Sequence, residues 1–235
     1  PPPDVPTLVR RGRAYARRSD FARALEAFTG AVDLDPGDPD LYLERAAAHA
    51  AADELDLAVD DFTAALGLRP DDADAYVGRA AAHFDRGDLD AAVEDYSEAL
   101  RLDPGNPDAL NGRASALTRR GDHEAALADY AAALEREPDG FRLFFNRGNC
   151  HSARGDWAAA EADYTRAVAA YPRHPRAYLY RAVCREHLGR PAEAIADLGT
   201  ALRLSPHLPE GYWHRGRLFA AAGDHAKAVA DYGRV

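Results

Sequence analysis

The chain has 235 residues, with 39 acidic side chains against 29 basic ones, a formal net charge of −10 and a pI near 5.3. This balance argues against nucleic acid as a partner, because nucleic-acid binding needs a basic stripe. No apolar run approaches the ~18 residues of a membrane-spanning helix, and no apolar core of a signal peptide is present, so no membrane partner is predicted.

The charge is distributed unevenly along the chain. Residues 1–106 carry 11 basic and 23 acidic side chains, whereas residues 107–235 carry 18 and 16. A solvated acidic face is the simpler interpretation. The alternative is that the acidic half steers or repels charged partners.

In chain order, residues 1–4 are predicted to be an extended, proline-rich lead-in. From there a proline recurs every 34 residues, and such a fixed period is typical of stacked repeats. These prolines are Pro36, Pro70, Pro104, Pro138, Pro172 and Pro206. With Val5 as position 1, the repeats span 5–38, 39–72, 73–106, 107–140, 141–174, 175–208 and a truncated 209–235. They form one array over residues 5–235.

Each repeat is predicted to be a helix, a turn and a second helix. In the third repeat, Tyr76, Ala80 and His83 share one helical face, and Gly87 suits a left-handed turn after that helix. Small residues such as Ala92 let the two helices approach closely. Capping residues also recur at the predicted helix starts. Asp38 can cap a helix whose first residue is Pro39, and Asn106 can do the same before Pro107.

The repeat resembles the tetratricopeptide repeat. That family places a bulky residue at position 4, small residues at 8, 20 and 27, a bulky or aromatic residue at 11, an aromatic at 24 and proline at 32. Repeat five matches with Phe144, Gly148, His151, Ala160, Tyr164, Ala167 and Pro172. The resemblance covers nearly the whole chain and implies an all-α fold, a right-handed α-solenoid of stacked antiparallel helix pairs.

Two polar residues recur in the repeats. Position 7 is arginine in all seven repeats, from Arg11 to Arg215, and position 23 is aspartate in six, from Asp61 to Asp231. Because a ligand site would not need the same residue in every unit, we expect a structural ion pair between helices or repeats. The tripeptide Arg-Gly-Asp also occurs three times, and its first copy begins at Arg86. Because each copy lies at the predicted turn between the two helices of its repeat, an adhesion role is not favoured.

No catalytic or metal-binding pattern is present. Cys150 and Cys184 occupy position 10, where alanine is usual, so both are expected to be small buried residues without a disulfide. The nine histidines lack metal-ligand spacing, and no nucleophile with a nearby base can be named. No enzyme activity, metal or cofactor is therefore predicted.

The resemblance implies a protein–protein interaction scaffold that binds a peptide or a partner domain in a concave groove. The alternative is a regulatory or substrate-recruiting arm of a larger enzyme or signalling protein. The last predicted helix carries apolar residues, among them Val229 and Tyr232, that no polar cap covers. This uncapped face makes self-association through that end a further alternative, and it suggests that the parent chain continues. Unpaired thiols suit a reducing, cytoplasmic location, and arginine in place of lysine suggests a bacterial genome.

In this family the inner surface comes from first-helix positions 2, 5, 6, 9, 12 and 13. Repeats one to three mostly place apolar or small residues there, such as Val9, Leu43 and Ala47, whereas later repeats place amides, arginines and aromatics. The predicted partner-binding residues are Asn111, Ser115, Arg142, Phe145, Asn146, Asn149, Arg176, Tyr180, Trp213 and His214. This mixture suits an extended peptide with an acidic group. One alternative is that these residues form an ordinary solvent-exposed concave surface that binds no partner. Another is that the binding site lies in the acidic half of the chain.

Overall fold

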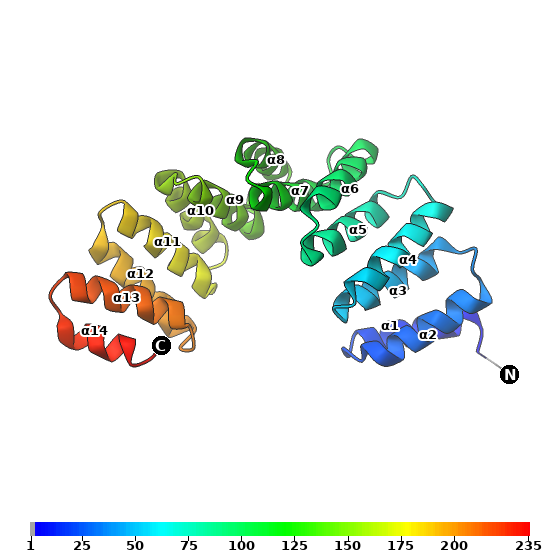
Figure 1. The fold of residues 1–235 in the computed structure, drawn as a ribbon, viewed down its shortest axis with the longest axis horizontal. Coiled ribbons are helices and arrows are strands. Elements are labelled where there is room, and N and C mark those ends of the chain that lie inside the picture. The colour runs from blue at the N-terminus through cyan, green and yellow to red at the C-terminus, as the bar shows by residue number, and fades with distance from the viewer. Residues whose placement is uncertain (1–2) are drawn as a thin grey trace. The chain divides into compact units, whose positions relative to one another are not determined.

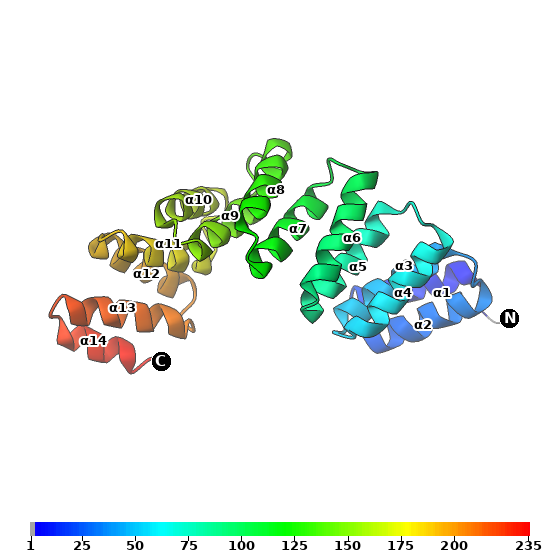
Figure 2. The ribbon, with the colours of Figure 1, turned by 45° about the horizontal axis from the view of Figure 1, so that its top comes forward.

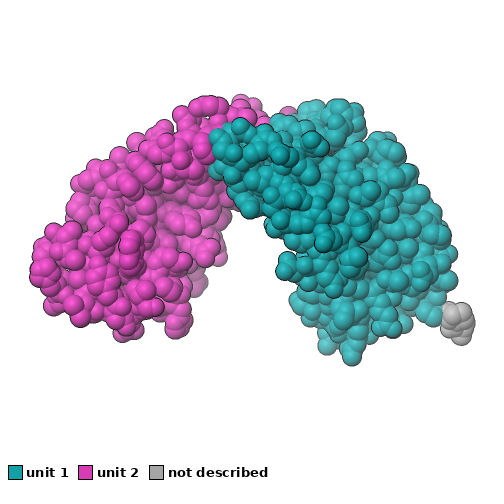
Figure 3. All heavy atoms as spheres, in the orientation of Figure 1, with its two compact units in different colours: residues 1–122 teal, residues 123–235 magenta. Residues whose placement is uncertain are grey.

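A computed structural model describes residues 3–235, which form fourteen α-helices and no strand. The described residues divide into two compact units, 1–122 and 123–235, of which residues 1 and 2 lie outside the description (Figure 3). The predicted lead-in is therefore described only at Pro3 and Asp4, which directly precede the first helix.

The first unit holds seven helices: α1 (Val5–Ala16), α2 (Phe21–Leu34), α3 (Pro39–Ala51), α4 (Leu55–Leu68), α5 (Ala73–Arg86), α6 (Leu89–Leu102) and α7 (Pro107–Arg120). The second unit holds seven more: α8 (His123–Arg136), α9 (Phe141–Ala153), α10 (Trp157–Ala170), α11 (Pro175–His187), α12 (Pro191–Leu204), α13 (Pro209–Ala221) and α14 (His225–Tyr232).

Within each unit, successive helices pack side by side (Figures 1 and 2). Helix–turn–helix pairs are formed by α1 with α2, α3 with α4 and α5 with α6 in the first unit, and by α9 with α10, α11 with α12 and α13 with α14 in the second. In the first unit the first helices of adjacent repeats also touch, α1 with α3 and α3 with α5. The expected all-α solenoid of helix pairs is thereby confirmed.

Helix starts follow the predicted capping chemistry. The Asp38 carboxylate accepts a hydrogen bond from the backbone N–H of Asp40 at 2.9 Å, one residue after Pro39 opens α3. The Asn106 side chain likewise accepts from the N–H of Ala109 at 2.9 Å at the start of α7. These side chains satisfy backbone donors that have no partner within the helix.

The turn inside each repeat needs a left-handed backbone at position 15. Gly87 and Gly121 have φ values of 94° and 98°, and later repeats also place glycine at this position. The first two repeats place Ser19 and Asp53 there instead, with φ values of 57° and 63°. A residue with a Cβ is strained in this region, whereas glycine is not.

The core depends on alanines that bring paired helices together. Positions 20 and 27 are alanine in the first six repeats, and these twelve side chains are at most 1% exposed. The aromatic ring at position 24 fills the space beside them, and Phe28 and Tyr164 are almost completely buried. Burial of such rings stabilises each pair because large apolar areas leave water.

The position 7 arginine joins the two helices of its own repeat. In repeats two, three, five, six and seven its Nε and Nη2 donate to both carboxylate oxygens of the position 23 aspartate, at 2.6–2.8 Å. The aspartates are buried. Several of these arginines also reach back one repeat, as Arg79 does to the Thr63 hydroxyl at 3.1 Å. The predicted ion pair is confirmed, and it lies within a repeat.

Two further expectations are met. Cys150 and Cys184 are buried and unbridged. The Arg86-Gly87-Asp88 tripeptide forms a turn in which the Arg86 guanidinium pairs with Asp88 and, at 2.7 Å, with Asp56 of the preceding repeat. Each of these side chains therefore has a packing role.

Replacing Asp53 with glycine should stabilise the first unit. Asp53→Gly removes left-handed strain of about 1–2 kcal/mol, offset in part by the greater freedom of glycine in the unfolded chain. We expect a gain of about 0.5–1 kcal/mol in the free energy of unfolding, measured by urea denaturation. The matched change in the other direction, Gly87→Asp, should destabilise by a similar amount, and a gain from both changes would contradict this account.

Removing one of the position 7 arginines should show how much the ion pair contributes to the free energy of unfolding. Arg147→Ala leaves the buried Asp163 carboxylate without its bidentate partner, so we expect a loss of about 3 kcal/mol in unfolding free energy. Arg154→Ala breaks an ion pair with the exposed Glu124 and should cost under about 1 kcal/mol. Equal losses for the two variants in urea unfolding would refute the structural role.

Candidate partner-binding surface

The ten predicted residues lie on the first helices of repeats four to seven. Asn111 and Ser115 are on α7 of the first unit. The other eight belong to the second unit: Arg142, Phe145, Asn146 and Asn149 on α9, Arg176 and Tyr180 on α11, and Trp213 and His214 on α13. The surface is therefore described for each unit separately.

The two residues of the first unit present little polar surface. Asn111 is only 8% exposed. The Ser115 hydroxyl donates to the Asn111 carbonyl at 2.8 Å, four residues back on the same helix. Such back-bonding turns the hydroxyl toward its own helix, so these two side chains offer less to a partner than their polarity suggests.

An aromatic cluster joins α9, α10 and α11 in the second unit. Phe145 stacks on Tyr180 with ring centroids 5.6 Å apart, and it meets Tyr164 edge-on at 5.8 Å. Phe141 extends the cluster, 5.6 Å from Phe145 and 4.7 Å from the ring of His174. Offset and edge-on arrangements of this kind are the favoured geometries for aromatic pairs. Two predicted residues, Phe145 and Tyr180, are thus brought into contact.

Beside this cluster lies a hollow of about 340 Å³, here called the second-unit hollow. Its lining residues are Asn149, Ser152, Ala153, Tyr164, Tyr180 and Val183. The Tyr164 hydroxyl donates to the Asn149 side-chain oxygen at 2.7 Å, and burial raises the pKa of Tyr164, so the hydroxyl stays protonated. This bond orients the Asn149 amide at the edge of the hollow.

The imidazole of His174 lies among the aromatic rings. Within the described part of the chain, its buried Nδ1 makes no hydrogen bond. Burial lowers the pKa of His174, and the nearby positive charge of Arg176 lowers it further. The ring is therefore held in its neutral form at pH 7.

A second group of predicted residues lies on α13. The Trp213 ring is 45% exposed and meets His214 edge-on at 4.9 Å, while the Arg217 guanidinium sits 4.8 Å from its centroid. Arg217 also pairs with Glu186 on α11 at 2.5 Å. Burial and Arg217 lower the pKa of His214, and Glu186 opposes them only in part. An exposed indole with a fixed cation on its face is a suitable contact for a partner side chain.

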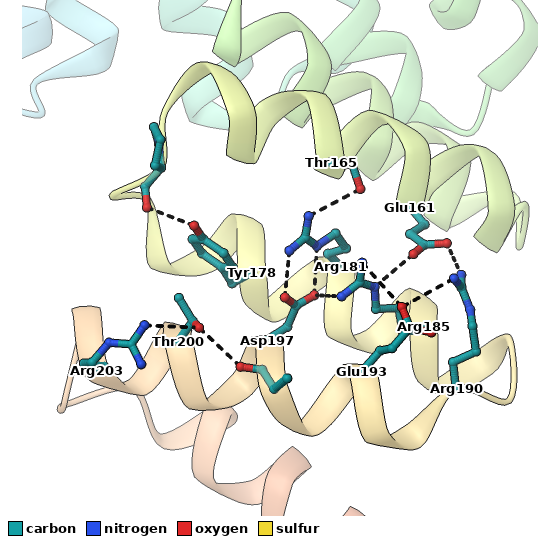
Figure 4. Close-up of polar contacts among 12 residues, drawn as sticks. Glu161, Thr165, Tyr178, Arg181, Arg185, Arg190, Glu193, Asp197, Thr200 and Arg203 are labelled. Carbon is teal, nitrogen blue, oxygen red and sulfur yellow. Dashed lines mark hydrogen bonds and ion pairs between the residues drawn. The ribbon is translucent and has the colours of Figure 1, made fainter.

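A charge network holds the helices around α11 together (Figure 4). Arg185 donates to Glu161 on α10 and to Asp197 on α12, each at 2.9 Å, and Arg190 also pairs with Glu161. Burial acts to raise the pKa of Glu161, but the hydrogen bonds from Arg185 and Arg190 outweigh it and leave that pKa lowered. The network braces three helices next to the second-unit hollow.

The structure also reveals a larger hollow, of about 750 Å³, that the sequence prediction missed. This first-unit hollow lies between α1 and α3 over α2 and is lined by Arg10, Arg13, Ala16, Arg17, Phe21, Phe28, Glu44, Ala47, Ala48 and Ala51. A signal was present in the sequence, since Arg10, Arg13 and Arg17 have the spacing of one helix face. Apolar and small residues at other inner positions of the same repeats, such as Val9 and Ala47, mask this signal in the sequence.

The described residues hold no group of three or more histidine, cysteine or carboxylate side chains that could bind a metal ion. Burial raises the pKa of the Cys184 thiol to about 12, so it is not a ready nucleophile.

The Tetratricopeptide repeat family model matches six overlapping segments, 9–73, 54–107, 78–141, 111–160, 145–209 and 188–235. Together these segments run through almost the entire sequence. The chain belongs to the tetratricopeptide repeat family. Repeats of this family generally mediate protein–protein interactions.

Solved structures of other tetratricopeptide repeat proteins share the fold. A repeat protein from Parabacteroides merdae superposes with a TM-score of 0.79 at 21% identity, over 98% of this chain and 91% of that one. PilW, a type IV pilus biogenesis factor, gives 0.76 at 21% identity, over 82% and 90%. Cut9, from the Cut9–Hcn1 hetero-tetramer of the APC/C, gives 0.78 at 19% identity, over 92% of this chain and 43% of that one. At such identities the likeness shows the fold alone.

Among curated protein sequences, none matches significantly. Across the described residues, each helix is too short or too polar to cross a membrane.

The half-buried His174 should make stability fall in mild acid. The folded pKa of His174 lies below its ordinary value, so below about pH 6.5 the unfolded chain binds more protons than the folded one. Stability is therefore full above that pH and is lost as the pH falls toward the lowered pKa. Melting temperatures between pH 7.5 and about 5 should drop less for His174→Phe than for the wild type. The exposed His207→Phe is the control, and equal slopes for His174→Phe and the wild type would contradict this account.

Proposed function

We propose that this chain is a protein–protein interaction scaffold that binds an extended peptide, or such a segment of a partner domain, along first-helix positions of repeats five to seven. The observation that carries the proposal is the aromatic cluster of Phe145, Tyr164 and Tyr180 beside the second-unit hollow. Half-buried rings such as Phe145 and Tyr180, beside a hollow on a helical scaffold, form the kind of place where a partner anchors an apolar side chain.

Polar groups around the hollow supply the contacts that would orient a peptide. The Asn149 side-chain oxygen is engaged by Tyr164, which leaves the amide nitrogen as a donor for a peptide carbonyl. Arg176 is exposed, and its guanidinium suits bidentate pairing with a carboxylate. These groups favour an extended segment with an acidic residue near an apolar one.

Trp213 supports a contact further along the same unit. Its ring is exposed, and Arg217 is held against it by Glu186, so the indole is already positioned before a partner arrives. A contact that is ordered in advance lowers the entropic cost of binding.

The family and its relatives support a scaffold role by analogy of fold. Cut9, with the same fold, was solved in a hetero-tetramer with Hcn1. Tetratricopeptide repeat proteins are generally non-enzymatic scaffolds, and we propose no catalytic role for this chain.

The test begins with a peptide library displayed against the full chain, and the best binder is synthesised with a fluorescent label. Ala153→Trp places a large ring in the second-unit hollow, and Arg176→Ala removes the exposed cation. We expect the two changes together to weaken binding by about a hundredfold or more, since anchor contacts are worth about 2 kcal/mol or more. Fluorescence anisotropy measures the affinity.

The matched control is Arg166→Ala with Arg173→Ala, which removes two exposed arginines of the same unit that line neither hollow. This pair should leave both the affinity and the melting curve close to wild type. Undiminished binding by the Ala153→Trp, Arg176→Ala chain would exclude this surface as the binding site.

A further inference from the structure

The first-unit hollow occupies the same place in its repeats as the second-unit hollow does in its own. The second-unit hollow takes positions 9, 12, 13 and 24 of one repeat and positions 6 and 9 of the next. The first-unit hollow includes the same six positions, filled by Arg13, Ala16, Arg17, Phe28, Glu44 and Ala47. The two hollows therefore arise from the same packing, and their chemistry differs only through the side chains that line them.

The lining of the first-unit hollow is positively charged, in a half of the chain that is otherwise acidic. Three arginines face a single carboxylate, Glu44, and residues 1–106 contain only 11 basic side chains in all. Arg13 pairs with Glu44 at 2.5–2.8 Å. Among the described residues, neither Arg10 nor Arg17 makes a direct ion pair with a carboxylate, although the charge of Arg10 acts on the nearby Asp4 carboxylate and helps to lower its pKa.

The two arginines that lack a direct ion pair donate instead to neutral acceptors. Arg10 donates to the Thr7 hydroxyl and Arg17 to the Arg13 carbonyl, each at 3.3 Å. These bonds orient the guanidinium groups without neutralising them. The simplest structural role, a favourable interaction with the C-terminal end of α1, fits Arg17 but not Arg10, which lies two turns earlier.

The interior of the hollow is apolar and roomy. Alanines at positions 12, 9 and 13 of the two first helices leave space that longer side chains would fill, and the rings of Phe21 and Phe28 border it. A volume of about 750 Å³ exceeds that of any single side chain and admits a short stretch of backbone as well.

We propose that the first-unit hollow binds a partner segment in which a bulky apolar side chain is flanked by carboxylates. The apolar side chain enters the alanine-lined interior, and the carboxylates pair with Arg10 and Arg17. Charge complementarity specifies the acidic flanks, and the concave apolar interior suits an apolar peptide side chain. This surface lies in a different unit from the proposed peptide site, so each is tested by its own variants.

The probe is a fluorescein-labelled peptide in which two phenylalanines are flanked by glutamates on both sides. We expect it to bind the full chain, and the affinity to weaken in high salt because the pairing is electrostatic and exposed. Arg10→Glu with Arg17→Glu should weaken binding by at least about tenfold. Ala47→Trp, which fills the interior and leaves every charge in place, should weaken it to a similar degree and guards against a folding defect in the charge-reversal variant.

The control pair Arg166→Glu with Arg173→Glu makes the same charge change in the second unit and should leave the affinity within about twofold of wild type. A peptide with alanine in place of phenylalanine, and one with lysine in place of glutamate, should both bind at least about tenfold more weakly. The proposal is overturned if the alanine peptide binds as tightly as the probe, if Ala47→Trp has no effect, or if the control pair weakens binding as much as the Arg10, Arg17 pair. Displacement of the probe by oligothymidylate at matched charge would also overturn it, because the surface would then respond to charge alone.

Discussion

The ion pair between position 7 and position 23 is the interaction on which the rest of this molecule depends. It joins the two helices of a repeat with two short, parallel hydrogen bonds, and the same arginine often reaches a hydroxyl of the preceding repeat. Because the aspartate is buried, loss of the arginine would leave a charge without its partner between the helices. The alanines at positions 20 and 27 make the spacing of the helices short enough for the pair to form.

Position 11, which lies beside the ion pair, holds different residue types in different repeats. In repeats two, three and five a histidine places its Nε2 3.8 Å from the paired aspartate. In repeat six Arg185 takes the position and bonds the aspartate directly, which builds the wider network of Figure 4. The packing therefore tolerates an aromatic, an imidazole or a second cation beside the pair, and each choice changes how strongly the helices are braced.

The inner positions of the first helices take no part in this ion pair, and the differences between repeats lie at these positions. The same repeat positions line a hollow in each unit. An amide and tyrosines border the second-unit hollow, whereas arginines and alanines border the first-unit hollow. A repeated scaffold thus presents distinct chemistry at equivalent places, because the ion pair and the helix-packing alanines, at positions 7, 20, 23 and 27, line neither hollow.

The sequence alone determined the helices and their approximate ends, because these depend on short-range spacing that repeats seven times. It predicted a structural ion pair for the recurring arginines and aspartates, but only the structure showed that Arg147 pairs with Asp163 of its own repeat. The sequence also placed Phe145 and Tyr180 on one surface, but it could not place Tyr164 there. By pattern Tyr164 is a core residue of a second helix, yet its ring reaches between two first helices and borders the hollow. Only the tertiary structure decided this, because the reach depends on the close passage of Gly148, where an added Cβ would lie 2.9 Å from the ring.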